Sequence, residues 1–279
     1  MTRVRALPPP ITFLSDYGQL DEFVGVCHGV IARRCPTARV IDLTHGIPRH
    51  DVRAGALILR AALPYVPAGI HLAVVDPGVG GSGEHARRAV ALRTAEEDRV
   101  LVGPDNGLLM LAAEALAGVL EAVDIGHSHE RIQPVSHTFH GRDVFAPVAA
   151  ALAAGEELAT VGSPLAPGEL RRLELPAARL IDGGLAAHVL RCDHFGNLIL
   201  DASLEQIAAA GAQPGDALTV EHAGRIHEAH YGATFADVRA GELVIYEDAQ
   251  RMIALALNHG SAAELLGAAR DDELMVRAG

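Results

Sequence analysis

Short apolar runs alternate with segments whose apolar positions recur at helical spacing over about the first 155 residues. The run at 11–15 predicts a buried strand, and the apolar positions between Phe23 and Ile31 predict a helix within 21–34. Further strands are predicted at 39–43, 71–75, 89–92 and 100–102, and further helices at 51–62, 106–117 and 145–154. Asp51 is in the N-cap position of its helix, and Pro64 ends that helix. This order predicts a mostly parallel α/β sheet covered by helices on both faces.

The pattern changes in the second half of the chain. Residues 162–176 are rich in Pro and Gly and show no firm periodicity, which suggests a linker. Short β runs separated by turn residues follow at 186–192, 198–200, 217–220, 242–246 and 252–256, which favours a small, mainly antiparallel β domain or barrel. We therefore expect an N-terminal α/β domain over 1–165, a linker over 166–178 and a C-terminal β-barrel over 179–279.

Polar residues follow three of the predicted strands of the first domain. Asp16 follows the first strand, Thr44 and His45 end the second, and Asp76 ends the third. Open α/β sheets bind ligands at the carboxyl ends of their strands. The three segments therefore predict a site at one rim of the sheet.

Two motifs near this rim carry candidate chemistry. The glycine-rich segment 76–81 either makes a tight turn or lets the backbone approach a ligand closely. It matches neither GxGxxG nor a P-loop, so a phosphate cradle is not expected. In segment 138–143, Asp143 reads as a helix cap paired with Arg142, whereas His140, beside a glycine, is a catalytic candidate.

The other polar segments are individually weak signals. Residues 193–197 can be a hairpin turn, and the segments around Phe235 and His259 are similar polar turn segments between β runs. Fifteen histidines also invite a metal hypothesis, with Asp16, His45, His50, Asp76 and His140 as possible ligands. No HExxH or CxxC motif is present, so no metal is expected and a metal hydrolase remains a minor alternative.

Composition excludes several classes of function. The formal net charge of −12 disfavours nucleic-acid binding, but it suits a cationic small molecule. No run of eighteen apolar residues predicts a membrane span, and the N-terminus does not resemble a secretory signal. Three scattered cysteines argue against a disulfide framework and favour a cytoplasmic location.

Taken together, these segments resemble the S-adenosylmethionine hydroxide adenosyltransferases, a family that also includes fluorinating and chlorinating enzymes. The resemblance runs over nearly the whole chain, through segments 15–21, 42–45, 75–80, 103–107, 138–146, 195–197 and 258–265. It implies an N-terminal catalytic α/β domain, a C-terminal adenine-binding barrel, and a homotrimer with sites between subunits. It also implies hydrolysis of S-adenosylmethionine by water attack at ribose C5′, without a cofactor.

The same resemblance assigns site residues. Asp76 and His140 match the family's catalytic aspartate and histidine. The loop before Arg87 and Arg88 is longer than in the family, so Arg87 is assigned as the catalytic arginine with Arg88 as the alternative. The implied substrate-binding residues are Asp16 for the ribose, Asp193 for the methionine end, Asn197, Phe235 and His259 for adenine, together with Asp21 and His50.

Two other functions remain open at this stage. A halogenase would share the fold and substrate, but an ionised Asp76 near the line of attack should repel a halide. A nucleoside-binding module without turnover is disfavoured because the full trio is present.

Overall fold

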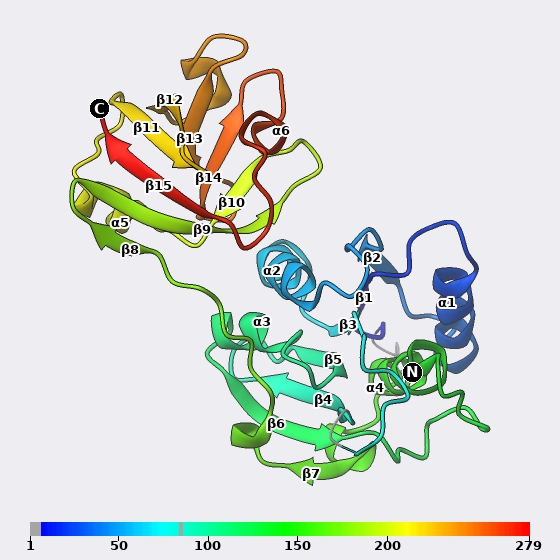
Figure 1. Cartoon of the computed structure of the whole chain (residues 1–279). Coiled ribbons are helices and arrows are strands. Elements are labelled where there is room, and N and C mark those ends of the chain that lie inside the picture. The colour runs from blue at the N-terminus through cyan, green and yellow to red at the C-terminus, as the bar shows by residue number, and fades with distance from the viewer. Residues whose placement is uncertain (1–6, 84–85) are drawn as a thin grey trace, which may run out of the picture. The chain divides into compact units, whose positions relative to one another are not determined.

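The structure, a computed structural model, describes residues 7–83 and 86–279 (Figure 1). It divides into two compact units, Met1–Leu173 and Glu174–Gly279. Each unit has a hydrophobic core of its own, so the two are described separately.

The first unit is built on a seven-stranded sheet in the order β2-β1-β3-β5-β4-β6-β7. The strands are β1 (Ile11–Ser15), β2 (Val40–Thr44), β3 (Ile70–Val74), β4 (Ala89–Thr94), β5 (Val100–Pro104), β6 (Val119–Asp124) and β7 (Ser163–Leu165). The pairs β1–β2, β1–β3 and β3–β5 are parallel, whereas β4, β6 and β7 continue the sheet with antiparallel pairs. The predicted α/β class is confirmed. Strand β7 lies within the stretch that the sequence suggested as a linker, so that stretch begins inside the sheet.

The reversed strand β4 determines where the residues before it lie. Ala89, its first residue, is opposite Pro104, the last residue of β5. Because β1, β2, β3 and β5 run in the same direction, the residue before β4 lies at the same edge as the ends of those strands. Segments from both ends of the loop 75–88 therefore meet at one rim.

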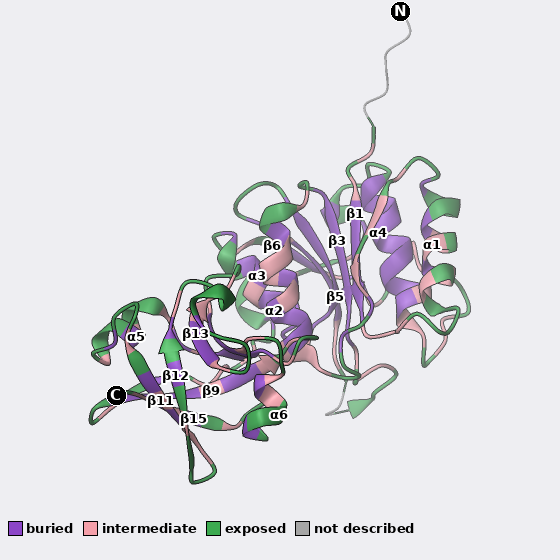
Figure 2. Ribbon diagram, turned by 90° about the horizontal axis from the view of Figure 1, so that it is seen from above, coloured by how far each residue is buried: buried purple, intermediate pink, exposed green. Residues whose placement is uncertain are grey.

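Helices cover both faces of this sheet (Figure 2). They are α1 (Phe23–Arg34), α2 (Val52–Ala62), α3 (Met110–Ala115) and α4 (Ala146–Ala153), which directly follows a π-helical turn (Gly141–Phe145). Neighbouring residues of a strand point to opposite faces, so Phe13 packs with α1 and α4 while Leu14 packs with α2 and α3. Single 3₁₀ turns span Leu63–Tyr65, Leu158–Thr160 and Pro167–Glu169.

Helix boundaries follow local hydrogen bonds. The Asp51 carboxylate accepts from the Ala54 amide at 3.0 Å, which confirms it as the N-cap of α2. Helix α3 is shorter than the predicted 106–117. Asn106 donates its side-chain amide to the Val75 carbonyl at 2.8 Å, and its side-chain oxygen accepts from the Leu108 amide. These bonds hold the segment before α3 in a turn at the end of β3.

A polar group lies buried inside the sheet. His71, with no exposed surface, lies between the Thr12 hydroxyl, 2.8 Å from its Nδ1, and Arg99, whose Nη1 is 3.2 Å from its Nε2. Arginine can only donate, so Nε2 accepts and Nδ1 carries the proton. Burial, together with the charge of Arg99, lowers the pKa of His71 to about 3. His71 is therefore a neutral member of the core.

The second unit is a closed β-barrel, as the sequence predicted. Its strands are β8 (Arg179–Ile181), β9 (Gly184–Cys192), β10 (Leu198–Leu200), β11 (Ala217–His222), β12 (Arg225–Tyr231), β13 (Leu243–Glu247), β14 (Ile253–Leu257) and β15 (Glu273–Ala278). Strand β10 pairs with both β14 and β9, which closes the barrel, and β8 pairs only with β9. All pairs are antiparallel except β12–β13. Two short helices, α5 (Leu204–Ala209) and α6 (Ala262–Leu266), and a 3₁₀ turn (Phe235–Asp237) complete the unit.

Candidate active site

Asp76, Arg87 and His140 meet at the rim of the first unit. Arg87 donates from Nε to Asp76 Oδ1 at 2.9 Å and from Nη2 to Asp76 Oδ2. The same Nη2 lies 2.9 Å from His140 Nδ1. The side chains of Asp76 and Arg87 are only 7% and 5% exposed, so this is a buried ion pair. Three segments distant in the sequence, the end of β3, the start of β4 and the turn before α4, supply the group.

The contact with Arg87 determines which ring nitrogen of His140 carries the proton. A guanidinium group has no acceptor, so Nδ1 accepts the hydrogen bond and the proton of neutral His140 resides on Nε2. Burial, and secondly the charge of Arg87, lowers the pKa of His140. At neutral pH the ring is therefore uncharged and presents an N–H on the side away from Arg87.

The neighbouring arginine points elsewhere. Arg88 donates from Nε to Asp105 Oδ2 at 2.9 Å and also bonds Glu169. Asp105 is buried and accepts from the Arg171 amide as well. The structure therefore brings Arg87, and not Arg88, into contact with Asp76 and His140.

A cavity of about 280 Å³ opens beside this group and is lined by three of the other predicted site residues. Asp16, Asp21 and His50 line it together with Asp76 and His140. The backbone amide of His50 donates to Asp16 Oδ2 at 2.9 Å, which fixes the Asp16 carboxylate. Arg87 does not line this cavity and lies behind Asp76 and His140.

An aromatic wall that sequence reasoning did not identify encloses this cavity. Tyr17, Phe23 and Phe139 line it and contact one another edge to face or tilted, with ring centroids 5.2–5.9 Å apart. Burial raises the pKa of the Tyr17 hydroxyl well above its usual value, so this hydroxyl stays neutral. The position of Tyr17 directly after Asp16 was the one available signal for it.

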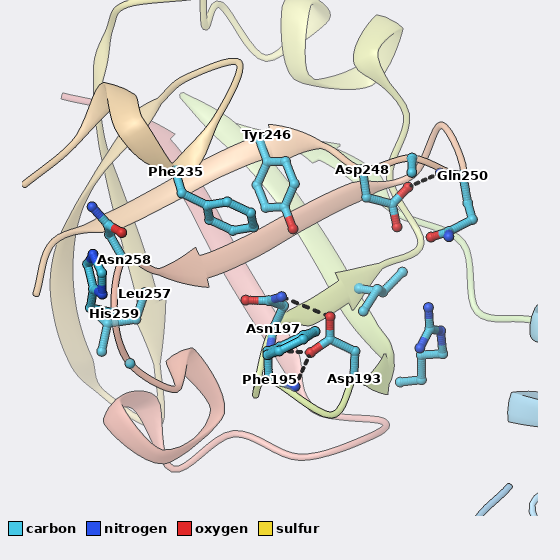
Figure 3. A pocket seen from close by; sticks show the side chains of 14 residues that line it. Asp193, Phe195, Asn197, Phe235, Tyr246, Asp248, Gln250, Leu257, Asn258 and His259 are labelled. Atoms are coloured by element: carbon cyan, nitrogen blue, oxygen red, sulfur yellow. Dashed lines mark hydrogen bonds between the residues drawn. The ribbon is translucent and has the colours of Figure 1, made fainter. Parts of the chain in front are cut away.

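The remaining predicted residues line a separate cavity of about 690 Å³ in the barrel (Figure 3). Asp193 Oδ1 accepts from the amides of Phe195 and Asn197, and Oδ2 accepts from the Asn197 side chain at 2.8 Å. Phe235 and His259 also line this cavity. The hairpin turn that the residues 193–197 suggested therefore exists, and it also presents polar side chains to a cavity.

Tyr246 is a second aromatic residue of this cavity that the sequence did not single out. Its ring centroid is 5.0 Å from that of Phe235, at an interplanar angle of 60°. Burial raises the pKa of its hydroxyl to about 12. Tyr246 ended a predicted strand, where periodicity cannot distinguish a core aromatic from one that faces a ligand.

Four of the five possible metal ligands proposed from the sequence line the cavity of the first unit, but in the described part of the chain no three of the five bring their ligand atoms within 4.8 Å of one another. Among the residues that the structure describes, only His28, Asp42 and His45 bring three potential ligand atoms within 4.8 Å of one another. Of the five candidates from the sequence, this group contains only His45.

Within residues 7–83 and 86–279, none of the helices combines the length and apolar character needed to cross a membrane.

Comparisons with known proteins match nearly the whole chain. Models of the SAM hydroxide adenosyltransferase N-terminal and C-terminal domains match residues 11–162 and 187–275. A relative in Salinispora tropica named (R)-S-adenosyl-L-methionine hydrolase is 50% identical over 276 residues, covering 97% of this chain and 98% of the relative. A protein of the same name in Thermus thermophilus is 40% identical, covering 92% of this chain and 95% of that protein.

Proteins of lower sequence identity also match this chain. A fluorinase of an Actinoplanes species is 28% identical over 272 residues, covering 90% of this chain and 91% of the fluorinase. The crystal structure of an uncharacterized conserved protein from Thermotoga maritima superimposes with a TM-score of 0.85 at 34% identity, covering 95% of this chain and 99% of the other. The two matched domains and the 50% identity show that this chain belongs to the S-adenosylmethionine (SAM) hydroxide adenosyltransferase family.

Proposed function

We propose that this protein hydrolyses SAM, with water attacking ribose C5′ to give adenosine and L-methionine. The observation that carries the proposal is the Asp76–Arg87–His140 group beside a cavity, in a chain half identical to a relative named as this hydrolase. The net charge of −12 also suits a sulfonium substrate.

The chemistry places its main demand on the nucleophile. The C5′–S bond breaks as the C5′–O bond forms, and methionine leaves as a neutral thioether that needs no general acid. Water must be held in line with that bond and must lose a proton. In-line positioning alone supplies several kcal/mol of the barrier reduction.

The tautomer of His140 divides the roles within the trio. While Nδ1 accepts from Arg87, His140 offers only an N–H to the cavity, so it orients the water oxygen and does not take its proton. Asp76 is the acceptor of the group and receives the proton, as a general base. Arg87 acts through the other two, because it fixes the carboxylate with two hydrogen bonds and the imidazole with one.

We assign substrate binding to the two cavities. In the first unit Asp16 binds the ribose hydroxyls, with Asp21 and His50 beside it. In the barrel Phe235 stacks on adenine, Asn197 and the backbone near His259 bond its edge, and Asp193 meets the methionine end. The domain roles follow: residues 1–165 form the catalytic domain, 166–178 a linker, and 179–279 the adenine-binding barrel.

We further propose a homotrimer in which each substrate lies between the catalytic domain of one subunit and the barrel of its neighbour. The assigned contacts are divided between the two domains, so neither cavity alone binds the whole molecule. Sedimentation should show a trimer, whereas a fully active monomer would contradict this assembly. The cytoplasm is the proposed location, because Cys27, Cys35 and Cys192 are all free thiols.

The names of the relatives specify the (R) epimer at sulfur, and we extend that preference to this chain. The test is to incubate purified protein with each epimer separately in ¹⁸O-labelled water and to analyse products by chromatography and mass spectrometry. We expect adenosine labelled at its 5′-oxygen, methionine, and faster turnover of the (R) epimer. Unlabelled adenosine, or no turnover, would contradict the hydrolase proposal.

A halide as nucleophile is the second candidate, because fluorinases are distant relatives. The ionised Asp76 beside the cavity disfavours a halide there. Adding chloride to the same assay should leave adenosine as the product, whereas mainly 5′-chloro-5′-deoxyadenosine would favour the halogenase.

A further inference from the structure

Two histidines and an aspartate meet between α1 and the end of β2, outside the proposed active site. His28 belongs to α1, Asp42 to β2, and His45 directly follows β2. The Nε2 atoms of His28 and His45 lie 2.9 Å and 3.1 Å from the same oxygen, Asp42 Oδ1. None of the three residues belongs to the catalytic group or lines the cavity beside it.

His45 has a buried nitrogen that the protein leaves unsatisfied. The side chain is 3% exposed, and its Nδ1 lies 2.7 Å from the Ser15 hydroxyl. Its Nε2 makes no hydrogen bond with any residue in the described part of the chain. The contact with Asp42 is short enough for an ion pair, but it lacks the alignment of an N–H···O hydrogen bond. A buried polar atom without a partner is destabilising, so Nε2 is a position at which a ligand would be favourable.

From this arrangement we propose that His28, Asp42 and His45 bind one divalent transition-metal ion of the zinc class. Imidazole nitrogens and a carboxylate oxygen are ligands that zinc accepts, with bonds of about 2.0–2.2 Å. In a tetrahedral site such bonds place ligand atoms about 3.3 Å apart. The two measured separations are a few tenths of an ångström shorter, so small side-chain movements open room for the ion.

The surroundings suit such a site. His28 and Asp42 are 35% and 42% exposed, so the ion reaches them from solvent and water completes its coordination. The Ser15 hydroxyl bonds the second nitrogen of His45, the kind of outer contact that orients metal-binding histidines.

Binding of an ion here would stabilise the turn that carries Asp16 and Tyr17, two residues that line the cavity of the first unit. The His45 carbonyl accepts from the Gly18 amide at 2.8 Å, and the Ser15 hydroxyl accepts from the Tyr17 amide at 3.3 Å. Both bonds hold the turn that carries Asp16 and Tyr17. The ion is therefore assigned a structural role, in addition to the proposed hydrolysis and independent of it.

The test uses untagged, EDTA-treated protein titrated with Co²⁺, followed by its visible absorption, and then with competing Zn²⁺. We expect one equivalent of Co²⁺ to bind, Zn²⁺ to displace it, and Zn²⁺ to raise the melting temperature. His28→Gln should weaken Co²⁺ binding at least tenfold and abolish the Zn²⁺-dependent shift. His230→Gln, on an exposed position of β12, is the matched control and should behave like the wild type.

Absence of stoichiometric binding, or binding that His28→Gln leaves unchanged, would overturn the proposal. If circular dichroism shows that His28→Gln is unfolded, Asp42→Asn takes its place with the same expected loss.

Discussion

The backbone of Gly141 lies against the hydroxyl group of Tyr17, so closely that a Cβ at position 141 would overlap that oxygen. Gly141 directly follows His140, and Tyr17 directly follows Asp16. The contact therefore joins the segment that carries the proposed catalytic histidine to the segment that carries the proposed ribose ligand. Only glycine permits this approach.

Gly141→Ala should destabilise the protein by about 1–3 kcal/mol, the usual cost of overpacking, and should lower turnover because His140 is displaced. Removing the hydroxyl in Gly141→Ala/Tyr17→Phe should recover part of the stability. Gly29→Ala is the control: it lies in α1 with nothing within 4 Å of its added Cβ, and should be neutral or slightly stabilising. Chemical denaturation measures all three variants. A double variant no more stable than Gly141→Ala would contradict the overlap.

Asp76→Asn should lower turnover by about 10²-fold or more, because the amide cannot accept the proton of water. Asn keeps one acceptor oxygen for Arg87, whereas Asp76→Ala would remove both hydrogen bonds to the buried guanidinium and destabilise the fold further. SAM affinity, measured by calorimetry beside single-turnover kinetics, should change little. Asp98→Asn, at an exposed carboxylate that lines neither cavity, should leave turnover and affinity unchanged. Loss of binding with normal turnover of bound substrate would contradict the role of Asp76.

His140 should titrate below its usual pKa of about 6.5 in an NMR experiment, since burial and then Arg87 disfavour its charged form. Its signal is identified by its absence from the spectrum of His140→Gln. Arg87→Met should raise the midpoint, because it removes a positive neighbour and leaves Asp76, which favours the charged ring. A midpoint unchanged by Arg87→Met would show that the Nη2–Nδ1 contact does not govern the proton on His140.

Phe235→Ala should weaken the binding of SAM and adenosine alike by about 1–3 kcal/mol, the range for aromatic side chains that stack on bases. The chemical step at saturating substrate should be less affected. Calorimetry with adenosine measures the loss, and sedimentation checks that the oligomeric state is unchanged. Tyr65→Ala, at an exposed aromatic outside both cavities, is the control. Unchanged adenosine affinity would exclude Phe235 as the platform.

His71 should make the protein less stable in acid. Its folded-state pKa of about 3 lies below the unfolded value of about 6.5, so between these values the unfolded chain binds one more proton. The free energy of unfolding should therefore fall by up to about 1.4 kcal/mol per pH unit as pH decreases through this window, from this residue alone. His71→Gln should flatten the slope by that amount, while His230→Gln should not. Equal slopes for wild type and His71→Gln would contradict the assignment.

The pattern of apolar residues was sufficient to predict those strands whose residues are buried in an unbroken run. Strand β1 has five buried residues in a row, and its predicted bounds match the structure. Strand β12 was missed because four of its seven residues are exposed and Arg, His and Glu interrupt any apolar run. The direction of β4 was also beyond reach, since an apolar run carries no sign of whether its neighbour is parallel or antiparallel.

Some residues of the candidate site could likewise be predicted from the sequence, and others could not. Asp76 and His140 could be placed from strand ends and motifs, whereas the choice between Arg87 and Arg88 depended on loop geometry. The deciding feature is Asp105, which holds Arg88 from a turn that no local pattern links to it. Tyr17 and Tyr246 were missed because a pattern of apolar positions does not distinguish an aromatic side chain in the core from one that faces a cavity.

Because β4 runs antiparallel to β5, the position of Arg87 does not depend on the length of the loop that precedes it. Pairing of Ala89 with Pro104 anchors the start of β4, and Asp76 is anchored independently by the end of β3. The two anchors therefore fix the guanidinium and its carboxylate independently of the number of residues between them. A loop that is longer before Arg87, as the sequence indicated, is therefore compatible with the same contact between Arg87 and Asp76.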